Sequence, residues 1–265
     1  MGLRNLFASL TLACGALLVG NAQAAYSTYF GEDLNDSETE PLKSTPKADQ
    51  ARQGFLSRLQ KVGTETFEAQ SAGTQAPLTL KFPGSSGDLT ATLSGGDGSV
   101  REVTPGATDG FGRYSVPSAT TSRFWDVAAG IDEAATFTVD FGQAIAAFGF
   151  YGIDIGDFGG QLELLLFNGD EPLDSLTIGN TEGDGGSTGG SVLYFGLIAQ
   201  QAGDVFTSVS FRMTTVDIDV FAFDDFTIGE LSQVVPPQPV PEPGTLALLA
   251  AALAALRVSR HQRAR

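Results

Sequence analysis

The sequence predicts an all-β protein, an antiparallel β-sandwich of jelly-roll type with one N-terminal amphipathic helix. Short segments rich in Thr, Val and Phe follow one another after residue 63, each bounded by Gly, Pro, Asp or Ser. The composition combines 33 Gly with 19 Phe, which suits short strands joined by tight turns. The chain shows no repeated βαβ unit, so the regular spacing of these segments favours a sandwich over a parallel sheet.

The body of the sandwich is predicted to span residues 63–231. We expect strands at residues 64–68, 78–82, 89–94, 112–116, 123–127, 135–141, 144–155, 161–168, 173–178, 192–198, 205–213 and 220–228. The Gly-rich segment 179–191 lacks the Gly-Lys-Ser/Thr ending of a phosphate loop, and we interpret it as a flexible hairpin connection.

Residues 25–62 precede this body and form an acidic lead-in followed by a helix. Residues 26–46 are polar and acidic, which predicts irregular structure. Thr45 and Pro46 then supply an N-cap and a first helical residue. One face of the following segment repeats at the helical period, at Ala48, Ala51, Phe55, Leu56, Leu59 and Val62. We expect this helix to pack against the sandwich or to cover one of its edges.

The N-terminus is predicted to be a secretory signal peptide over residues 1–24. Arg4 precedes an apolar run at 6–19, and Ala22 and Ala24 stand at the positions that signal peptidase requires. A membrane anchor is a weaker alternative, because the run falls short of the roughly 20 residues that span a bilayer. A lipoprotein signal at Cys14 is weaker still, because Thr11 stands where such a signal has Leu.

The C-terminus has three parts in a fixed order. A Pro-rich linker covers residues 232–243, and an uncharged run follows at 245–256. As a helix, that run reaches about 18 Å against about 30 Å of hydrocarbon, too short for a permanent anchor by itself. The basic residues of the tail are Arg257, Arg260, Arg263 and Arg265.

These parts resemble the PEP-CTERM sorting signal of exported proteins from Gram-negative bacteria that make exopolysaccharide. The motif itself is Val240, Pro241, Glu242 and Pro243, and the resemblance covers residues 240–265. It implies transient insertion of the tail into the inner membrane, removal of the tail by a membrane-embedded exosortase, and release to the cell surface or the extracellular matrix. A C-terminal membrane helix on a proline-rich stalk is the alternative.

Four segments of the body, at 63–68, 110–114, 148–160 and 223–228, also resemble the globular region of many PEP-CTERM proteins. This likeness implies a surface or matrix protein and supplies no catalytic residues.

Composition excludes several function classes. The chain has 15 Lys+Arg against 31 Asp+Glu, a formal charge of −16, which disfavours nucleic acid as a partner. Its one Cys and one His, Cys14 and His261, lie in the terminal segments. The body therefore has no Cys nucleophile, no Ser-His-Asp triad and no Cys/His zinc site. Five basic residues also lie in those segments, so processing beyond Glu242 makes the released domain more acidic.

One candidate site is a structural Ca²⁺ site between the first strand of the sandwich and the last. In a jelly roll these strands commonly run side by side, and carboxylate oxygens are the ligands that Ca²⁺ prefers. The candidate ligands are Glu65, Glu68, Asp224 and Asp225. Similar sandwich domains that bind carbohydrate often carry calcium at this junction, which the resemblance extends to this chain. The alternative is that these acids are solvated residues at strand ends.

A second candidate site combines aromatic rings with carboxylates, as sugar-binding sites do. Its candidate residues are Trp125, Tyr151, Asp154 and Asp157, in part from the loop that also contains Phe158. A single Trp in a strand is more often a core residue than a ligand platform, which is the alternative for Trp125.

Three function classes remain open at this stage. The first is a non-catalytic surface or matrix protein, which we expect rather than an enzyme. The second is a carbohydrate-binding module that recognises exopolysaccharide. The third is a glycan-active enzyme, since two carboxylates suffice to hydrolyse a glycosidic bond, although nothing in the sequence selects such a pair.

Overall fold

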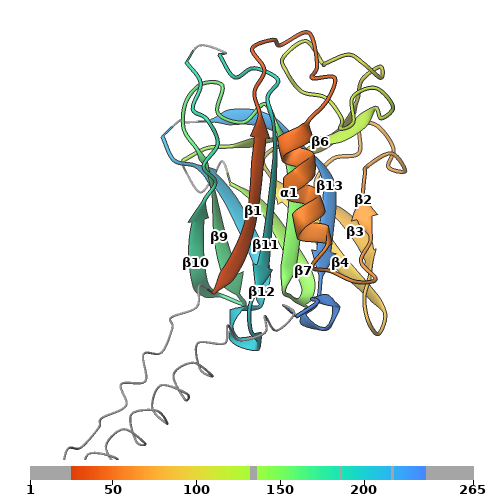
Figure 1. The fold of residues 1–265 in the computed structure, drawn as a ribbon, viewed down its shortest axis with the longest axis vertical. Helices are drawn as coiled ribbons and strands as arrows, with labels where there is room; N and C mark the ends of the chain where they lie inside the picture. Colours follow the sequence, from red (N-terminus) through yellow and green to blue (C-terminus); the bar gives the residue numbers. More distant parts are fainter. Residues whose placement is uncertain (1–24, 132–135, 185–186, 216–217, 237–265) are drawn as a thin grey trace, which may run out of the picture.

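The computed structural model describes residues 25–131, 136–184, 187–215 and 218–236, which form two antiparallel sheets packed face to face (Figure 1). In order across the first sheet lie β1 (Tyr26–Asp33), β11 (Val192–Ala199), β8 (Ala147–Ile153), β13 (Asp219–Gly229), β6 (Arg123–Ala129) and β5 (Ser99–Glu102), with β2 (Thr64–Glu65) paired to the far half of β13. In order across the second lie β10 (Glu171–Thr177), β9 (Leu162–Asn168), β12 (Phe206–Met213), β7 (Phe137–Ile145), β4 (Asp88–Gly95) and β3 (Leu78–Pro83). The predicted all-β antiparallel sandwich is confirmed, while its jelly-roll type stays a prediction.

Phenylalanine rings fill the space between the sheets. Phe148 and Phe150 of β8 and Phe223 and Phe226 of β13 meet Phe211 of the opposite sheet in a cluster of edge-on and tilted contacts. The rings of Phe150 and Phe223, for example, lie 4.8 Å apart at 81°. Such edge-to-face pairs add to the free energy of burial, so the high Phe content is a property of the core.

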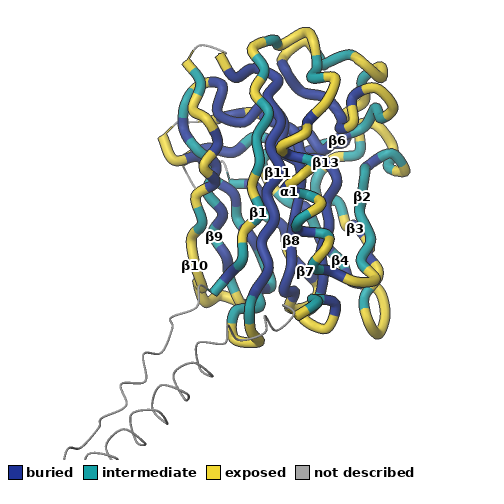
Figure 2. The backbone as a smooth tube through the Cα atoms, in the orientation of Figure 1, coloured by how far each residue is buried: buried dark blue, intermediate teal, exposed yellow. Residues whose placement is uncertain are grey.

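The two sheets differ in how their outer faces are covered. Strands β4 and β9 alternate between buried and less buried residues, as expected when one face contacts solvent. Strands β8 and β11 are buried at every residue. Figure 2 shows this continuous burial in the middle of the first sheet, where a helix and a long irregular segment cover the outer face.

The helix α1 (Pro46–Leu56) packs on β1 and β11, as expected of a helix that covers the sandwich. Phe55 is its fully buried anchor, and its ring lies over Gly149 and Gly196 of the sheet. A Cβ atom at Gly196 would lie 2.6 Å from the Phe55 ring. Glycine at this position therefore makes the close approach of helix to sheet possible.

The helix N-terminus is capped from β1. Thr45 occupies the N-cap position but makes no side-chain cap, and its hydroxyl bonds Asp49 instead. The Oδ2 atom of Asp33 accepts the backbone N–H groups of Lys47 and Ala48, each at 3.0 Å. The last residue of β1 thus satisfies two of the N–H groups that a helix start leaves free.

The expected irregular lead-in over 26–46 is wrong in its first part. Tyr26 to Asp33 form an eight-residue strand paired along its whole length with β11. Its aromatic and hydroxylated residues suit an edge strand. The acidic side chains at its end accept hydrogen bonds, Glu32 from Thr181 and Asp33 from the start of the helix. The sandwich therefore begins at Tyr26 and not at residue 63.

Two other expectations in the body are wrong. The segment 112–116 is no strand, because Gly110 and Gly112 adopt positive φ angles of 91° and 87°, which turn the backbone away from an extended course. The segment 179–191 is no hairpin connection, because β10 and β11 belong to different sheets. Strand β5 was not predicted.

The sandwich has two unlike ends. At one end, Val192 of β11 pairs in register with Asp33 of β1 and with Ile153 of β8, and β13 also begins there at Asp219. We call this the loop end. At the opposite end, the terminal end, β1 starts and β13 finishes (Figure 1). The predicted signal peptide, most of the predicted linker and all of the sorting signal lie outside the described residues.

Candidate functional site

A cavity of about 440 Å³ opens at the loop end of the sandwich, within the size range of small-molecule sites. Four segments far apart in the sequence line it: the chain after β1, the irregular segment 103–122, the loop after β8, and the start of β13. Its lining residues are Glu38, Phe111, Arg113, Asp154, Asp157, Phe158, Ile218, Asp219 and Val220. We call this cavity the acidic pocket.

Three aspartates form the floor of the acidic pocket. Asp154, Asp157 and Asp219 are 2%, 4% and 1% exposed. Asp154 accepts the N–H of Gly190 at 2.7 Å, and Asp219 accepts the N–H of Gly156 at 2.9 Å. Backbone amides therefore fix two of the three carboxyl groups in the floor.

The remaining oxygens of the floor are poorly satisfied. Among the described residues, Asp157 Oδ1 and Asp219 Oδ1 are buried and have no donor. The charges of the two carboxyl groups disfavour each other, so the pair is more stable with a proton on one of them. Buried polar atoms without partners are rare and point to a missing proton, ion or ligand.

Burial makes these carboxyl groups hard to ionise. It raises the pKa of Asp154 to about 8, and the charges of Asp157 and Asp219 add to the effect, while the Gly190 N–H and Arg113 oppose it. Burial also raises the pKa of Asp157 and of Asp219, which titrate as a pair. Carboxyl groups with raised pKa values in a cavity are a common feature of functional sites.

Apolar side chains surround the opening of the pocket. Phe111 and Phe158 are 66% and 67% exposed, and Ile218 and Val220 are 55% and 38% exposed. Single exposed apolar residues need no explanation, but a group of them around a cavity is typical of a binding surface. The acidic pocket thus combines a polar floor with an aromatic rim.

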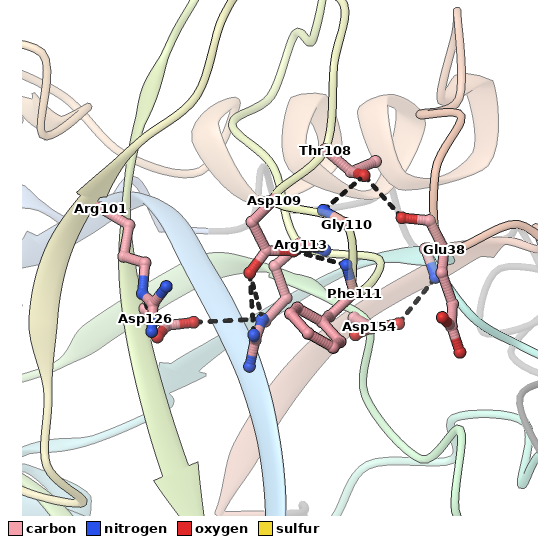
Figure 3. A network of polar contacts seen from close by, with 10 residues as sticks. Glu38, Arg101, Thr108, Asp109, Gly110, Phe111, Arg113, Asp126 and Asp154 are labelled. Atoms are coloured by element: carbon pink, nitrogen blue, oxygen red, sulfur yellow. Dashed lines mark hydrogen bonds and ion pairs between the residues drawn. The ribbon is translucent and has the colours of Figure 1, made fainter.

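A network of ion pairs holds Phe111 in place (Figure 3). Asp109 accepts the backbone N–H groups of Phe111 and Arg113 through one carboxylate oxygen and the Arg113 guanidinium through the other, with Nε at 2.9 Å. Arg113 also pairs with Asp126, which Arg101 contacts from the other side at 2.7 Å. The guanidinium carbon of Arg113 lies 5.7 Å from the centre of the Phe111 ring.

This network also decides the charge of the pocket. Arg113 is the one cationic residue among the lining residues, and its guanidinium already binds two carboxylates, Asp109 and Asp126. Asp109 and Asp126 therefore largely neutralise the guanidinium charge of Arg113, which compensates little of the charge of the floor carboxyl groups.

The structure divides the four predicted ligand residues. Asp154 and Asp157 lie together in the pocket. Trp125 is fully buried in the core and stacks on Phe67 at 6.3 Å. Tyr151 is buried under α1, where its hydroxyl donates to Asp49 at 2.6 Å. The expectation that the Trp and the Tyr share a surface with the two aspartates is wrong, because the helix and the opposite sheet cover them.

Sequence reasoning missed Phe111 and Asp219 as site residues. Phe111 lies between Gly110 and Gly112, and a large ring between two glycines in a polar segment is a detectable sign of an exposed tip. Asp219 comes from a strand start about 60 residues after Asp154 and carries no comparable signal.

The predicted calcium site brings together the expected strands but not the expected ligands. Glu65 of β2 pairs in register with Phe226 of β13. Its carboxylate, however, accepts the N–H of Phe67 at 2.7 Å, and that of Glu68 accepts the N–H of Arg123 at 2.7 Å. The carboxylates of both glutamates therefore already accept hydrogen bonds from backbone N–H groups.

The two aspartates of that prediction are likewise engaged. Asp224 is fully buried and accepts the Ser115 hydroxyl at 2.7 Å, and Asp225 pairs with Arg52 at 2.9 Å. Burial raises the pKa of Asp224 well above its usual range and that of Asp225 to about 6. Within the described part of the chain, no group of three or more acidic, His or Cys residues is arranged to hold a metal. Calcium at this junction stays a prediction, which calorimetric titration with Ca²⁺ of wild type and Glu65→Gln tests.

Comparison with known families matches the C-terminal tail, where the PEP-CTERM protein-sorting motif fits residues 239–263. The chain carries a PEP-CTERM sorting signal. This PEP-CTERM protein is thus an exported, surface-directed protein that an exosortase sorts, as the resemblance implied. Among the described residues, no helix is long and apolar enough to span a membrane.

Comparison with solved structures finds matches of low similarity to this PEP-CTERM protein. The K2 cleaved adhesin domain of Lys-gingipain (Kgp) is 17% identical, with a TM-score of 0.35 over 63% of this chain and 97% of that one. The K1 cleaved adhesin domain of the same protein from Porphyromonas gingivalis W83 is 13% identical, with a TM-score of 0.34 over 64% and 99%. Likeness at this level says nothing of the function of the chain. Comparison with curated proteins gives no match.

Proposed function

We propose that this chain is a non-catalytic, exported surface protein that binds a saccharide in the acidic pocket, and that the saccharide belongs to the exopolysaccharide of its own cell. The observation that carries this proposal is the combination of two exposed rings, Phe111 and Phe158, with buried carboxyl groups in one cavity. Aromatic rings stack on the apolar faces of sugars, and carboxyl groups bond their hydroxyls. The sorting signal supports a location outside the cell.

The protonation of the floor carboxyl groups supports binding over hydrolysis. Glycosidases need one carboxyl group as the acid and a second, ionised one as the nucleophile or base. Burial raises the pKa of Asp154, Asp157 and Asp219, which disfavours the ionised form that a nucleophile or base requires. The floor therefore suits recognition of a ligand better than attack on it.

A glycan array on the purified domain tests the binding proposal. We expect wild type to bind a defined set of saccharides and Phe158→Ala to lose about tenfold in affinity, which corresponds to about 1.4 kcal/mol of stacking energy. Phe30→Ala is the matched control, since Phe30 is also exposed, at 43%, but lies on β1 outside the pocket. An array on which no saccharide binds wild type, or on which both variants behave alike, would contradict the proposal.

The surface location has its own test. Fractionation of the native bacterium, followed by mass spectrometry of the mature C-terminus, should find the sandwich in the surface or extracellular fraction without its arginine tail. Recovery of a surface-exposed chain that still ends at Arg265 would contradict removal of the tail.

A further inference from the structure

The floor of the acidic pocket gathers more carboxyl groups than the surrounding residues satisfy with cations and donors. Asp154, Asp157 and Asp219 are each at least nine-tenths buried. The one cation among the lining residues, Arg113, binds Asp109 and Asp126 with its guanidinium. A buried carboxylate without a partner is unstable, so it must take up a proton or a cation.

The arrangement of the floor distinguishes between kinds of cation. Ca²⁺ needs six to eight oxygens in a close shell, and no group of three acidic residues in the described chain is arranged for this. An ammonium group needs only a few acceptors at hydrogen-bond distance. The Oδ1 atoms of Asp157 and Asp219 are buried acceptors without donors at the pocket floor.

The rim adds a second attraction for an organic cation. Phe111 and Phe158 each expose about two-thirds of their surface at the opening. Aromatic faces attract ammonium groups through the charge distribution of the ring, and more strongly where water is excluded. A ligand with an apolar ring face and a positive charge uses both the rim and the floor.

We propose that the acidic pocket binds a protonated amine, and that its saccharide ligand is one with free amino groups, such as a glucosamine polymer. The choice of a saccharide rests on the proposed function. The preference for an amine rests on the buried, unpartnered Oδ1 atoms of Asp157 and Asp219. A lysine side chain would offer the same ammonium group. It presents no ring face to Phe111 and Phe158, so the two exposed rings favour an amino sugar.

Calorimetric titration with three probes at pH 6 tests the inference. The probes are a tetramer of β-1,4-linked glucosamine, the same tetramer fully N-acetylated, and pentalysine. We expect the free-amine tetramer to bind at least tenfold more tightly than the acetylated one and than pentalysine. We also expect its affinity to fall with added salt, because the attraction is between charges.

Two variants locate the charge effect. Asp219→Asn and Asp157→Asn keep the size of the side chain and remove an ionisable group, and each should reduce the ratio of free-amine to acetylated-tetramer affinity at least fivefold. Circular dichroism checks that each variant folds, and the probe comparison on wild type does not depend on either variant.

The remaining outcomes separate the two proposals. Equal binding of both tetramers would overturn the amine inference and leave the saccharide function standing. Tighter binding of pentalysine would assign the pocket to peptides and overturn both. Tight Ca²⁺ binding that Asp219→Asn abolishes would assign the charge to a metal and overturn the amine inference alone.

Discussion

Asp154→Asn should make the protein more stable at alkaline pH. The carboxyl group of Asp154 is buried next to Asp157 and Asp219, and burial raises its pKa from 3.8 to about 8. Asparagine keeps an Oδ1 acceptor for the Gly190 N–H. It also tolerates the left-handed backbone of this position, where φ is 69°. The substitution thus removes a titrating group with little other change.

The sign and size of the effect follow from proton linkage. The folded state holds the proton of Asp154 up to about pH 8, whereas the unfolded chain releases it near pH 4. The stabilisation is complete below about pH 4 and is lost as the pH rises through the folded pKa. Each pKa unit corresponds to about 1.4 kcal/mol, so wild type loses on the order of 4 kcal/mol between pH 5 and pH 8. This is a large part of the 5–15 kcal/mol typical of a domain.

Urea unfolding at pH 5 and pH 8 measures this loss. We expect wild type and Asp154→Asn to have similar free energies of unfolding at pH 5, and the variant to be several kcal/mol more stable at pH 8. Asp219 and Asp225 also have raised pKa values, so the variant keeps a smaller slope of the same sign. Asp170→Asn, at an exposed turn, is the control. Equal slopes for wild type and Asp154→Asn would refute the reasoning, because Asp154 would then ionise normally in the folded state.

Three further substitutions probe the fold. Gly196→Ala places a methyl group against the Phe55 ring and should lower the free energy of unfolding by about 1–3 kcal/mol, measured by thermal unfolding. Phe55→Leu in the same chain should restore part of this stability. Full additivity of the two substitutions would show that the two residues do not touch. Asp33→Ala removes the cap of α1 and should cost about 1 kcal/mol, whereas Asp33→Asn should cost less; an unchanged midpoint for Asp33→Ala would contradict the cap. Arg113→Met leaves buried Asp126 with one cation fewer and should cost about 3–5 kcal/mol at pH 7, more than Arg113→Lys; equal losses would contradict a role for the guanidinium.

Strand positions were predictable where the pattern of the chain is local. In β7, Phe137, Val139 and Phe141 alternate with polar residues, and this period alone places them on one buried face. Strand β1 had no such pattern, because only Tyr26 is buried along it. Its stability comes from pairing with β11, more than 150 positions further along the chain. Local sequence carries no information on such a partner.

The site was predictable only in part for a related reason. The sequence placed Asp154 and Asp157 beside aromatic residues, which indicated the right loop. Whether a ring is exposed, however, depends on what covers its strand. Tyr151 lies on an outer face that α1 covers, while Phe111 extends from a segment that an ion-pair network holds at the surface. Covering elements come from elsewhere in the chain, so the exposed and buried rings could not be told apart beforehand.

The position of the pocket relative to the tail bears on how the protein works. Strand β13 starts at Asp219 in the pocket and ends at Gly229, ten residues later, at the terminal end. At about 3.3 Å per residue, this separates the pocket from the end of β13 by about 33 Å. A chain whose tail is held by a membrane-embedded exosortase would therefore present the acidic pocket on the side away from the membrane. The saccharide binding that we propose would then need no prior removal of the tail.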